Sequence, residues 1–243
     1  MKFITVKMRT IILVIAALIV AATLLVLVGA TRAAGLWTTG QPNRMQATYN
    51  VPAEERRVIA LTFDAAGDSH NVGRIIETLK EFDVTATVFV SGIWAERHTD
   101  ELVAANQAGI EIGTLGNAHV NMARLSSNIV GLELETSVRT IGGITGEEVA
   151  LFRPPFGAYN DNLLTAAQEA NLIPVMGNIN LTESQNQTPY QIASLALTGL
   201  TAGSIIILDS NCENAVNALP AMIAGSKGAG FEFVTVGELL KNF

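Results

Sequence analysis

The chain has one cysteine and three histidines among 243 residues, and its body carries no basic cluster. A single cysteine excludes an internal disulfide, so we expect Cys212 to be a packed small side chain rather than a reactive thiol. The net charge of −7, without a stripe of lysine or arginine, argues against nucleic acid as a partner. These absences exclude a disulfide scaffold and a typical nucleic-acid-binding protein.

Two groups of enzyme motifs are also missing. The sequence contains no glycine-rich phosphate loop and no dinucleotide-binding fingerprint, so it predicts no nucleotide cofactor. It contains no Gly-x-Ser-x-Gly nucleophile elbow, which leaves a serine hydrolase only as a remote alternative.

The N-terminal part contains one long uncharged run, residues 11–30. As a helix this run would span roughly 30 Å, the thickness of a bilayer core. Lys2, Lys7 and Arg9 precede it, and only Arg32 follows closely, which favours a cytoplasmic N-terminus. We therefore predict a single-pass anchor in a bacterial cell membrane, with the rest of the chain outside.

The alternative is a cleaved signal peptide and a secreted protein, although the apolar run is longer than such peptides usually have. In either case residues 1–10 form a short cytoplasmic tail before cleavage. Residues 31–56 are polar, with scattered glycine and proline, and are predicted to be a linker.

From residue 57 to residue 243, short apolar runs alternate with segments of helical spacing. Strands are expected over 58–63, 84–90, 110–113, 151–153, 172–176, 204–209 and 232–236. Helices are expected over 71–82, 95–107, 126–141, 160–170, 191–200 and 215–224, with a short one at the C-terminus. This alternation predicts an α/β domain with a parallel sheet, and the number of units favours a small, incomplete (β/α) barrel.

Several polar residues fall at the carboxyl ends of these strands, where barrel enzymes carry their chemistry. They are Asp64, Thr114, Arg153, Asn178 and Asp209. Arg153 precedes two prolines that fix its turn, and an arginine aimed at Asp64 would hold that carboxylate ionised. A structural salt bridge is the equally common alternative.

Two histidines could face the same end of the barrel. His119 follows a predicted strand and a polar turn, and His70 lies in the loop after Asp64. Each is either a metal ligand or a structural side chain.

Three segments together resemble the polysaccharide deacetylases with a NodB-homology domain. They are Leu61-Thr62-Phe63-Asp64, the strand Glu111-Ile112-Gly113 followed by His119, and Arg153-Pro154-Pro155-Phe156-Gly157. The resemblance covers essentially all of residues 57–243 and implies a deformed, TIM-like barrel. It is closest to a membrane-anchored, sporulation-associated branch, whose members often read Phe-Asp-Ala-Ala-Trp-Gly where this chain has Phe63-Asp64-Ala65-Ala66-Gly67.

The resemblance implies removal of acetyl groups from N-acetylated glycans such as peptidoglycan or chitin. In the family an Asp and two His hold a divalent metal, usually zinc, which activates a water. By this resemblance Asp64 is the catalytic base and Arg153 orients it. Phe156 offers its N–H to the oxyanion, and His119 is the second metal histidine.

The chain departs from the family pattern at three positions. Leu115 stands where the first metal histidine is expected, and Ala65 stands where the metal aspartate is expected. Asp209 replaces the histidine that acts as catalytic acid. His70 is then the candidate for a replacement metal ligand beside His119.

Two functions follow. The first is an active metal-dependent N-deacetylase with His70 and His119 as rearranged ligands. The second, which the residue chemistry favours, is an anchored, non-catalytic module that binds cell-envelope polysaccharide. A structural or scaffolding module without glycan binding is a more remote possibility.

Overall fold

The computed structural model describes residues 46–53, 56–68 and 70–242. The predicted anchor at residues 11–30 and the first part of the predicted linker lie outside these ranges. Within them, no helix is both long and apolar enough to cross a membrane.

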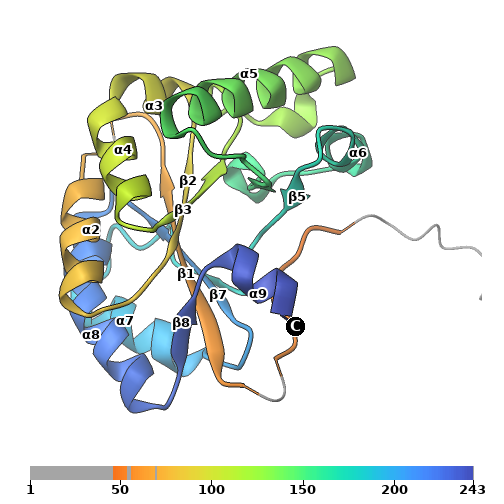
Figure 1. Ribbon diagram of the computed structural model, residues 1–243. Helices are drawn as coiled ribbons and strands as arrows, with labels where there is room; N and C mark the ends of the chain where they lie inside the picture. The colour runs from red at the N-terminus through yellow and green to blue at the C-terminus, as the bar shows by residue number, and fades with distance from the viewer. Residues whose placement is uncertain (1–45, 54–55, 69, 243) are drawn as a thin grey trace, which may run out of the picture. The chain divides into compact units, whose positions relative to one another are not determined.

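A curled sheet of parallel strands forms the centre of the domain (Figure 1). The strands are β1 Val58–Ala65, β2 Thr87–Val90, β3 Glu111–Thr114, β4 Leu151–Phe152, β5 Ile173–Pro174, β6 Ile179–Asn180, β7 Ile205–Asp209 and β8 Glu232–Val234. Their order is β5-β4-β3-β2-β1-β7-β6, and β8 pairs with the first residues of β1. The prediction of an incomplete α/β barrel is confirmed.

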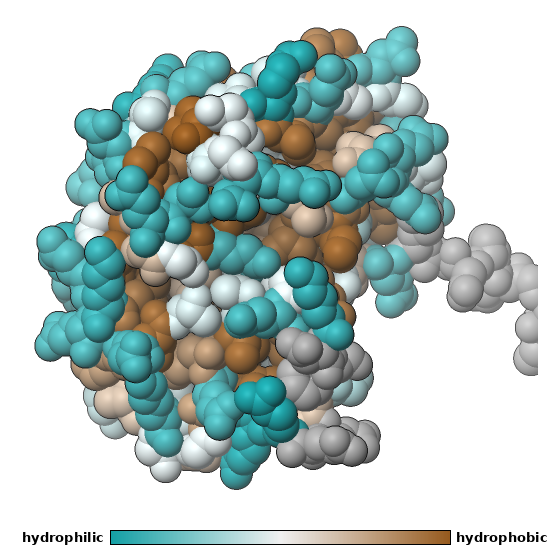
Figure 2. Space-filling view, viewed as in Figure 1, coloured by the Kyte–Doolittle hydropathy of each residue, from teal (hydrophilic) through white to brown (hydrophobic). Residues whose placement is uncertain are grey.

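Helices α2 to α8 cover the outer face of the sheet, and α9 packs on the inner face. The helices are α2 Val72–Glu81, α3 Gly92–Arg97, α4 Thr99–Gln107, α5 Ser127–Thr145, α6 Asp161–Glu169, α7 Pro189–Thr198, α8 Glu213–Gly228 and α9 Val236–Asn242, with the 3₁₀ turns η1 Met122–Arg124 and η2 Pro155–Gly157. Asn160 caps α6 as predicted, since its side chain accepts a hydrogen bond from Leu163 N. In the space-filling view, hydrophilic side chains cover the helices and apolar atoms show between them (Figure 2).

Two expectations differ from the structure. The predicted helix over 95–107 is two helices, α3 and α4, which meet at His98. The predicted strand over 172–176 shortens to β5, and the two-residue strand β6 was not predicted because so short a strand has no period to detect.

Side chains point alternately to the two faces of the sheet along each strand, and they form two separate apolar clusters. On β1, Ile59, Leu61 and Phe63 belong to the main core between sheet and helices. Val58 and Ala60 belong to a second cluster, which we call the inner cluster, on the concave face of the sheet. Every second residue of a strand therefore points into the half-barrel.

The segment of residues 46–53 and helix α9 fill the inner side. Val51 and Ala53 are buried in the inner cluster, and Val236 and Leu239 of α9 join them there. The segment also pairs with the chain near both edges of the sheet, Thr48 with Val175 and Asn50 with Ser204. We predicted a linker up to residue 56. The described part of it instead packs as a portion of the domain, because its alanine and valine side chains fit the opening of the curled sheet.

The close approach of this segment requires a glycine at position 203. Gly203 has φ +80°, its N–H donates to Val58 O, and its carbonyl accepts from Val51 N at 3.1 Å. A Cβ there would lie 1.5 Å from the carbonyl oxygen of Val51. Only glycine combines this backbone angle with this contact.

Gly203→Ala should therefore lower the free energy of unfolding by about 1–3 kcal/mol or more, measured by urea denaturation. Gly131→Ala is the matched control, because Gly131 lies within α5 with no atom near its Cβ position. That change should be neutral or stabilise the chain by up to about 1 kcal/mol. Equal stability of both variants would contradict the close packing of residues 46–53.

Candidate functional site

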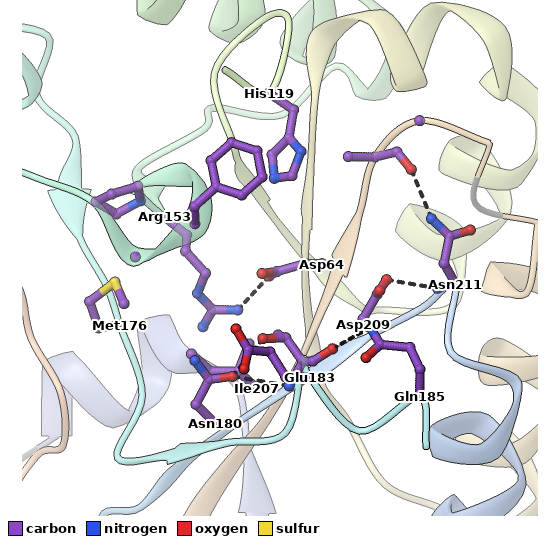
Figure 3. A pocket seen from close by; sticks show the side chains of 16 residues that line it. Asp64, His119, Arg153, Met176, Asn180, Glu183, Gln185, Ile207, Asp209 and Asn211 are labelled. Carbon is purple, nitrogen blue, oxygen red and sulfur yellow. Dashed lines mark hydrogen bonds and ion pairs between the residues drawn. The ribbon is translucent and has the colours of Figure 1, made fainter. Parts of the chain in front are cut away.

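A cavity of about 530 Å³ opens at the carboxyl ends of the strands (Figure 3). Asp64 from the end of β1 and Asp209 from the end of β7 line it, and the two residues are direct partners in the β1–β7 register. Arg153 reaches it from just after β4. These three sequence predictions are thus brought into one pocket by the inward-facing positions of their strands.

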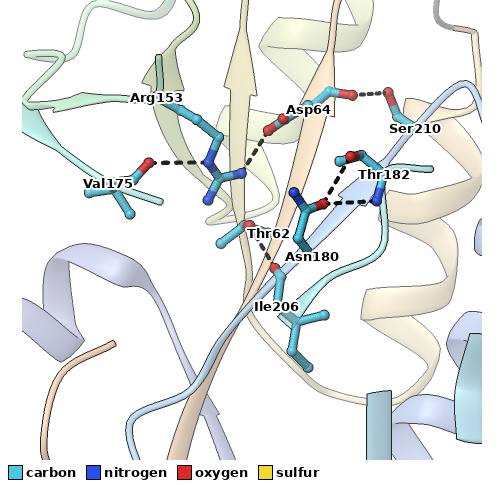
Figure 4. Close-up of polar contacts among 8 residues, drawn as sticks. All are labelled: Thr62, Asp64, Arg153, Val175, Asn180, Thr182, Ile206 and Ser210. Carbon is cyan, nitrogen blue, oxygen red and sulfur yellow. Dashed lines mark hydrogen bonds and ion pairs between the residues drawn. The ribbon is translucent and has the colours of Figure 1, made fainter. Parts of the chain in front are cut away.

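An ion pair between Arg153 and Asp64 lies at the floor of the pocket (Figure 4). Arg153 Nη1 donates to Asp64 Oδ1 at 2.6 Å, and Nε donates to the carbonyl of Val175 at 3.3 Å. The arginine side chain is 2% exposed and that of Asp64 is 21% exposed. Burial lowers the pKa of Arg153, while the charge of Asp64 acts in the opposite direction. The ion pair thus fixes the position and the orientation of the Asp64 carboxylate.

The ring of Phe89 packs against the guanidinium of Arg153. The Cζ atom of Arg153 lies 4.0 Å from the centroid of Phe89, a cation–π distance. Phe89 in turn lies over Gly113, where a Cβ would come within 2.6 Å of its ring. Gly113, part of the β3 motif, thus makes room for the ring that carries Arg153.

A backbone contact fixes the position of Asp64. The amide and the hydroxyl of Ser210 both donate to the carbonyl oxygen of Asp64, at 3.1 and 2.7 Å (Figure 4). This joins the ends of β1 and β7 directly beyond their last paired residues.

His119 enters the pocket from the loop after β3. The side chain of Glu133 on α5 holds this loop by accepting from the amides of Asn117 and Ala118, at 3.0 and 2.9 Å. His119 itself has φ +52°, an uncommon angle for a residue other than glycine. Burial lowers the pKa of His119, against the smaller raising effects of Asp64 and Asp209. Burial thus favours the neutral form of the imidazole.

Phe156 stands at the rim of the pocket, within the turn η2. Its φ is +59° and its side chain is 70% exposed. The ring packs against His119, with centroids 4.9 Å apart. Such a left-handed conformation costs on the order of 1–3 kcal/mol, and residues that adopt it cluster at functional sites.

Asp209 lines the pocket and has a pKa above the ordinary value of an aspartate. Its Oδ1 accepts a hydrogen bond from Asn211 N at 2.9 Å. Burial raises the pKa of Asp209, and this hydrogen bond opposes the rise while the charge of Asp64 adds to it. A proton or another positive charge near Asp209 is therefore favoured.

The residues of this site do not fit a zinc centre. A catalytic zinc takes three protein ligands, and the described ranges contain no group of three His, Cys, Asp or Glu side chains arranged to hold a metal. Leu115, at the position of the expected histidine, is fully buried in the inner cluster. Ala65 is also fully buried and faces the main core.

His70 does not line the pocket. Its ring is exposed, and Nδ1 lies 3.2 Å from the carbonyl oxygen of Asp68. The neighbouring Asn71 is buried and donates to the carbonyl of Ser210, which fixes the start of α2 and leaves His70 at the surface. In this structure the pocket lining therefore contains His119 without His70.

The sequence also misplaced two strand-end residues and missed part of the pocket. Asn178 precedes β6 and bonds with Ser204 and Ile205, away from the cavity. Thr114 points outward to Ser137. The missed lining residues follow or belong to β6: Asn180, Thr182, Glu183 and Gln185. Cys212 is buried in the main core, as predicted.

Comparison with known proteins identifies the family. Residues 52–175 match the polysaccharide deacetylase family, and the chain belongs to it. A bifunctional xylanase/deacetylase of Pseudobutyrivibrio xylanivorans is 28% identical over 77% of this chain and 31% of its own length. The peptidoglycan-N-acetylglucosamine deacetylase PgdA of Listeria monocytogenes is 25% identical over 77% of this chain and 40% of its own. The chain thus spans only about a third to two fifths of these relatives.

Among solved structures, a pseudoenzyme of carbohydrate esterase family 4 from Bacillus anthracis has the same fold. It superposes with a TM-score of 0.76 at 25% identity, over 81% of this chain and 70% of its own. A mutant of such a pseudoenzyme with restored enzymatic activity matches equally well, with a TM-score of 0.76 at 26% identity. The family therefore includes members described as pseudoenzymes.

The burial of the central ion pair predicts a large asymmetry between two acid-to-amide changes. Asp64→Asn leaves the Arg153 cation buried without its partner and should lower the free energy of unfolding by about 3–5 kcal/mol in urea denaturation. Glu135→Gln breaks the exposed pair with Arg139 and should cost less than about 1 kcal/mol. Similar losses in both variants would contradict the structural role of the buried pair.

His119 should titrate below the ordinary histidine value of 6.5, as measured by NMR of its ring protons. Because the unfolded chain binds this proton more readily, the stability that His119 contributes is lost as the pH falls below 6.5. Asp209→Asn should lower the pKa of His119 further, since a neighbouring negative charge is removed. Asp83→Asn, an exposed change far from the pocket lining, should leave it unchanged. A pKa at or above 6.5 would show that burial does not dominate.

Proposed function

We propose that this protein is a non-catalytic member of its family that binds cell-envelope glycan of the N-acetylated, peptidoglycan-like class. One observation carries the proposal. The pocket keeps its cavity, its oriented Asp64–Arg153 pair and its exposed Phe156, while His119 is the single imidazole among the described residues that line it. The names of the relatives, which include peptidoglycan deacetylases, supply the class of glycan.

The pocket has the features that sugar binding needs. Its volume of about 530 Å³ lies in the range of small-molecule sites. The exposed ring of Phe156 offers an apolar face on which the C–H side of a pyranose can pack. Asn180 and Gln185 add amide groups that can both donate to and accept from hydroxyls.

The second candidate is an active N-deacetylase with His70 and His119 as ligands of a divalent metal. It would require the loop of residues 66–70 to move inward, because His70 lies outside the pocket. Asp64 would then serve as base. The existence of relatives described both as deacetylases and as pseudoenzymes makes a direct test necessary.

We also propose that residues 11–30 anchor the protein in the cell membrane with the domain outside, where it meets the glycan. The charge bias of the flanking residues supports this orientation. The link to sporulation is likewise a proposal, which rests on the Phe63-Asp64-Ala65-Ala66-Gly67 segment.

The test combines binding with catalysis on the purified full chain. Chitin hexamer, added in a calorimetric titration, should bind, and Phe156→Ala should weaken the affinity by about tenfold or more through loss of ring contact. Tyr190→Ala is the control, since Tyr190 is 82% exposed outside this pocket and its removal should leave hexamer binding unchanged.

Zinc titration should show no binding tighter than about millimolar, and no acetate should be released with zinc present. Acetate release that depends on His70, His119 and Asp64 would instead establish the active deacetylase. Absence of both binding and catalysis would leave a scaffolding module.

A further inference from the structure

We propose that the pocket prefers a sugar that carries a free 2-ammonium group, that is, a glycan unit already stripped of its acetyl group. This inference rests on the proposed glycan-binding function and names the unit of the envelope glycan that the pocket prefers, one from which the acetyl group has been removed. On this inference the protein recognises glycan that has already been deacetylated and does not itself deacetylate it.

The charges around the cavity are unbalanced. Three carboxylates line it, from Asp64, Glu183 and Asp209. The cation that lines it is Arg153, and the 2.6 Å ion pair with Asp64 already compensates that charge. Burial lowers the pKa of His119, which disfavours a positive charge on its ring. Among the described residues of the lining, Asp209 and Glu183 are thus carboxyl groups without an ion-pair partner, in a partly desolvated pocket that favours a positive charge beside them.

Each of the two aspartate carboxylates has one oxygen that can still accept a hydrogen bond. Asp64 uses Oδ1 for Arg153, and Asp209 uses Oδ1 for the amide of Asn211. Within the part of the chain that the structure describes, the second oxygen of each carboxylate accepts no hydrogen bond, and Glu183 has no ion-pair partner. These oxygens are available to a ligand that donates.

The spacing of the two aspartates suits an ammonium group. Asp64 and Asp209 are paired residues on adjacent parallel strands, which lie about 4.8 Å apart. An ammonium has three N–H donors and can bridge two neighbouring carboxylates with charge-assisted hydrogen bonds. An acetamido group has one N–H, and its carbonyl oxygen would meet the carboxylates with like polarity.

Arg153 also has a buried donor without a partner. Arg153 is 98% buried and lines the cavity, yet its Nη2 has no hydrogen-bond partner among the described residues. An unpaired buried donor is costly. Because Nη2 has almost no accessible surface, a ligand hydroxyl would reach it only after a shift of the Arg153 side chain. Phe156 lines the pocket and is exposed, so the pocket offers acceptors for an ammonium and an apolar surface for the sugar ring.

A metal ion would satisfy the same negative charge, but its geometric demands are stricter. No set of three suitable side chains is arranged for a metal within residues 46–53, 56–68 and 70–242. An ammonium requires only individual hydrogen bonds of ordinary length. The geometry therefore favours the organic cation.

The experiment compares two ligands of equal length by calorimetry on the full chain, at about pH 6, where the sugar amine is protonated. Chitosan tetramer, with four free amines, should bind about tenfold or more tightly than chitin tetramer, with four acetyl groups. The preference should shrink as salt is raised, because part of it is electrostatic.

Asp209→Asn should abolish the preference, since it removes the charge and nearly keeps the shape. Asp83→Asn changes the net charge equally, and Asp83 lies away from this pocket, in an exposed turn whose left-handed φ of +49° asparagine also tolerates. It should leave the preference intact. Equal loss in both variants would reveal non-specific attraction to the acidic surface and would overturn the inference.

The remaining outcomes are also decisive. Equal or tighter binding of the acetylated tetramer would overturn the inference and leave glycan binding standing. Binding of neither tetramer, nor of the hexamer, would reject the proposed function itself. Magnesium or zinc that binds in an Asp209-dependent manner and displaces chitosan would assign the charge to a metal and overturn the ammonium site.

Discussion

The arrangement of this pocket depends on one buried ion pair. Arg153 is held from three directions, by the carboxylate of Asp64, by the carbonyl of Val175 and by the ring of Phe89. A guanidinium removed from water needs such compensation, so the strands that supply these groups must keep their positions. The pair thus couples β1 to the turn after β4, and the cavity opens above it.

The remainder of the site has two sides of different chemistry. On one side the turn η2 keeps Phe156 in its left-handed conformation at the rim. On the other side Asp209 and Glu183 contribute carboxylates to the lining. Leu115, which stands where the metal histidine was expected, is buried in the inner cluster and is not among the residues that line the cavity. The cavity therefore combines an exposed aromatic ring with acidic side chains.

Much of the fold could be predicted from the sequence, because its strands are short apolar runs bounded by turns and its helices have clear apolar faces. The sequence pattern identified Asp64, Arg153 and Asp209 because they occupy inward-facing positions at the ends of strands. The alternation of apolar and polar side chains along a strand reveals such positions. His70 could not be placed, since the path of its loop depends on the buried amide of Asn71 and its bond to Ser210, a contact 139 residues away in sequence. Glu183 and its neighbours escaped notice because β6 is too short to show a period.

The packing of residues 46–53 bears on where the domain can be cut. Val51 and Ala53 lie in the inner cluster, and this segment pairs with Val175 after β5 and with Ser204 before β7. A protease that cleaved after residue 53 would therefore remove part of the wall of the half-barrel instead of releasing an intact domain. A recombinant fragment begun at residue 57, the boundary that sequence periodicity suggests, would expose apolar surface and be prone to aggregate. The piece that connects the domain to the rest of the chain is also a piece of its core.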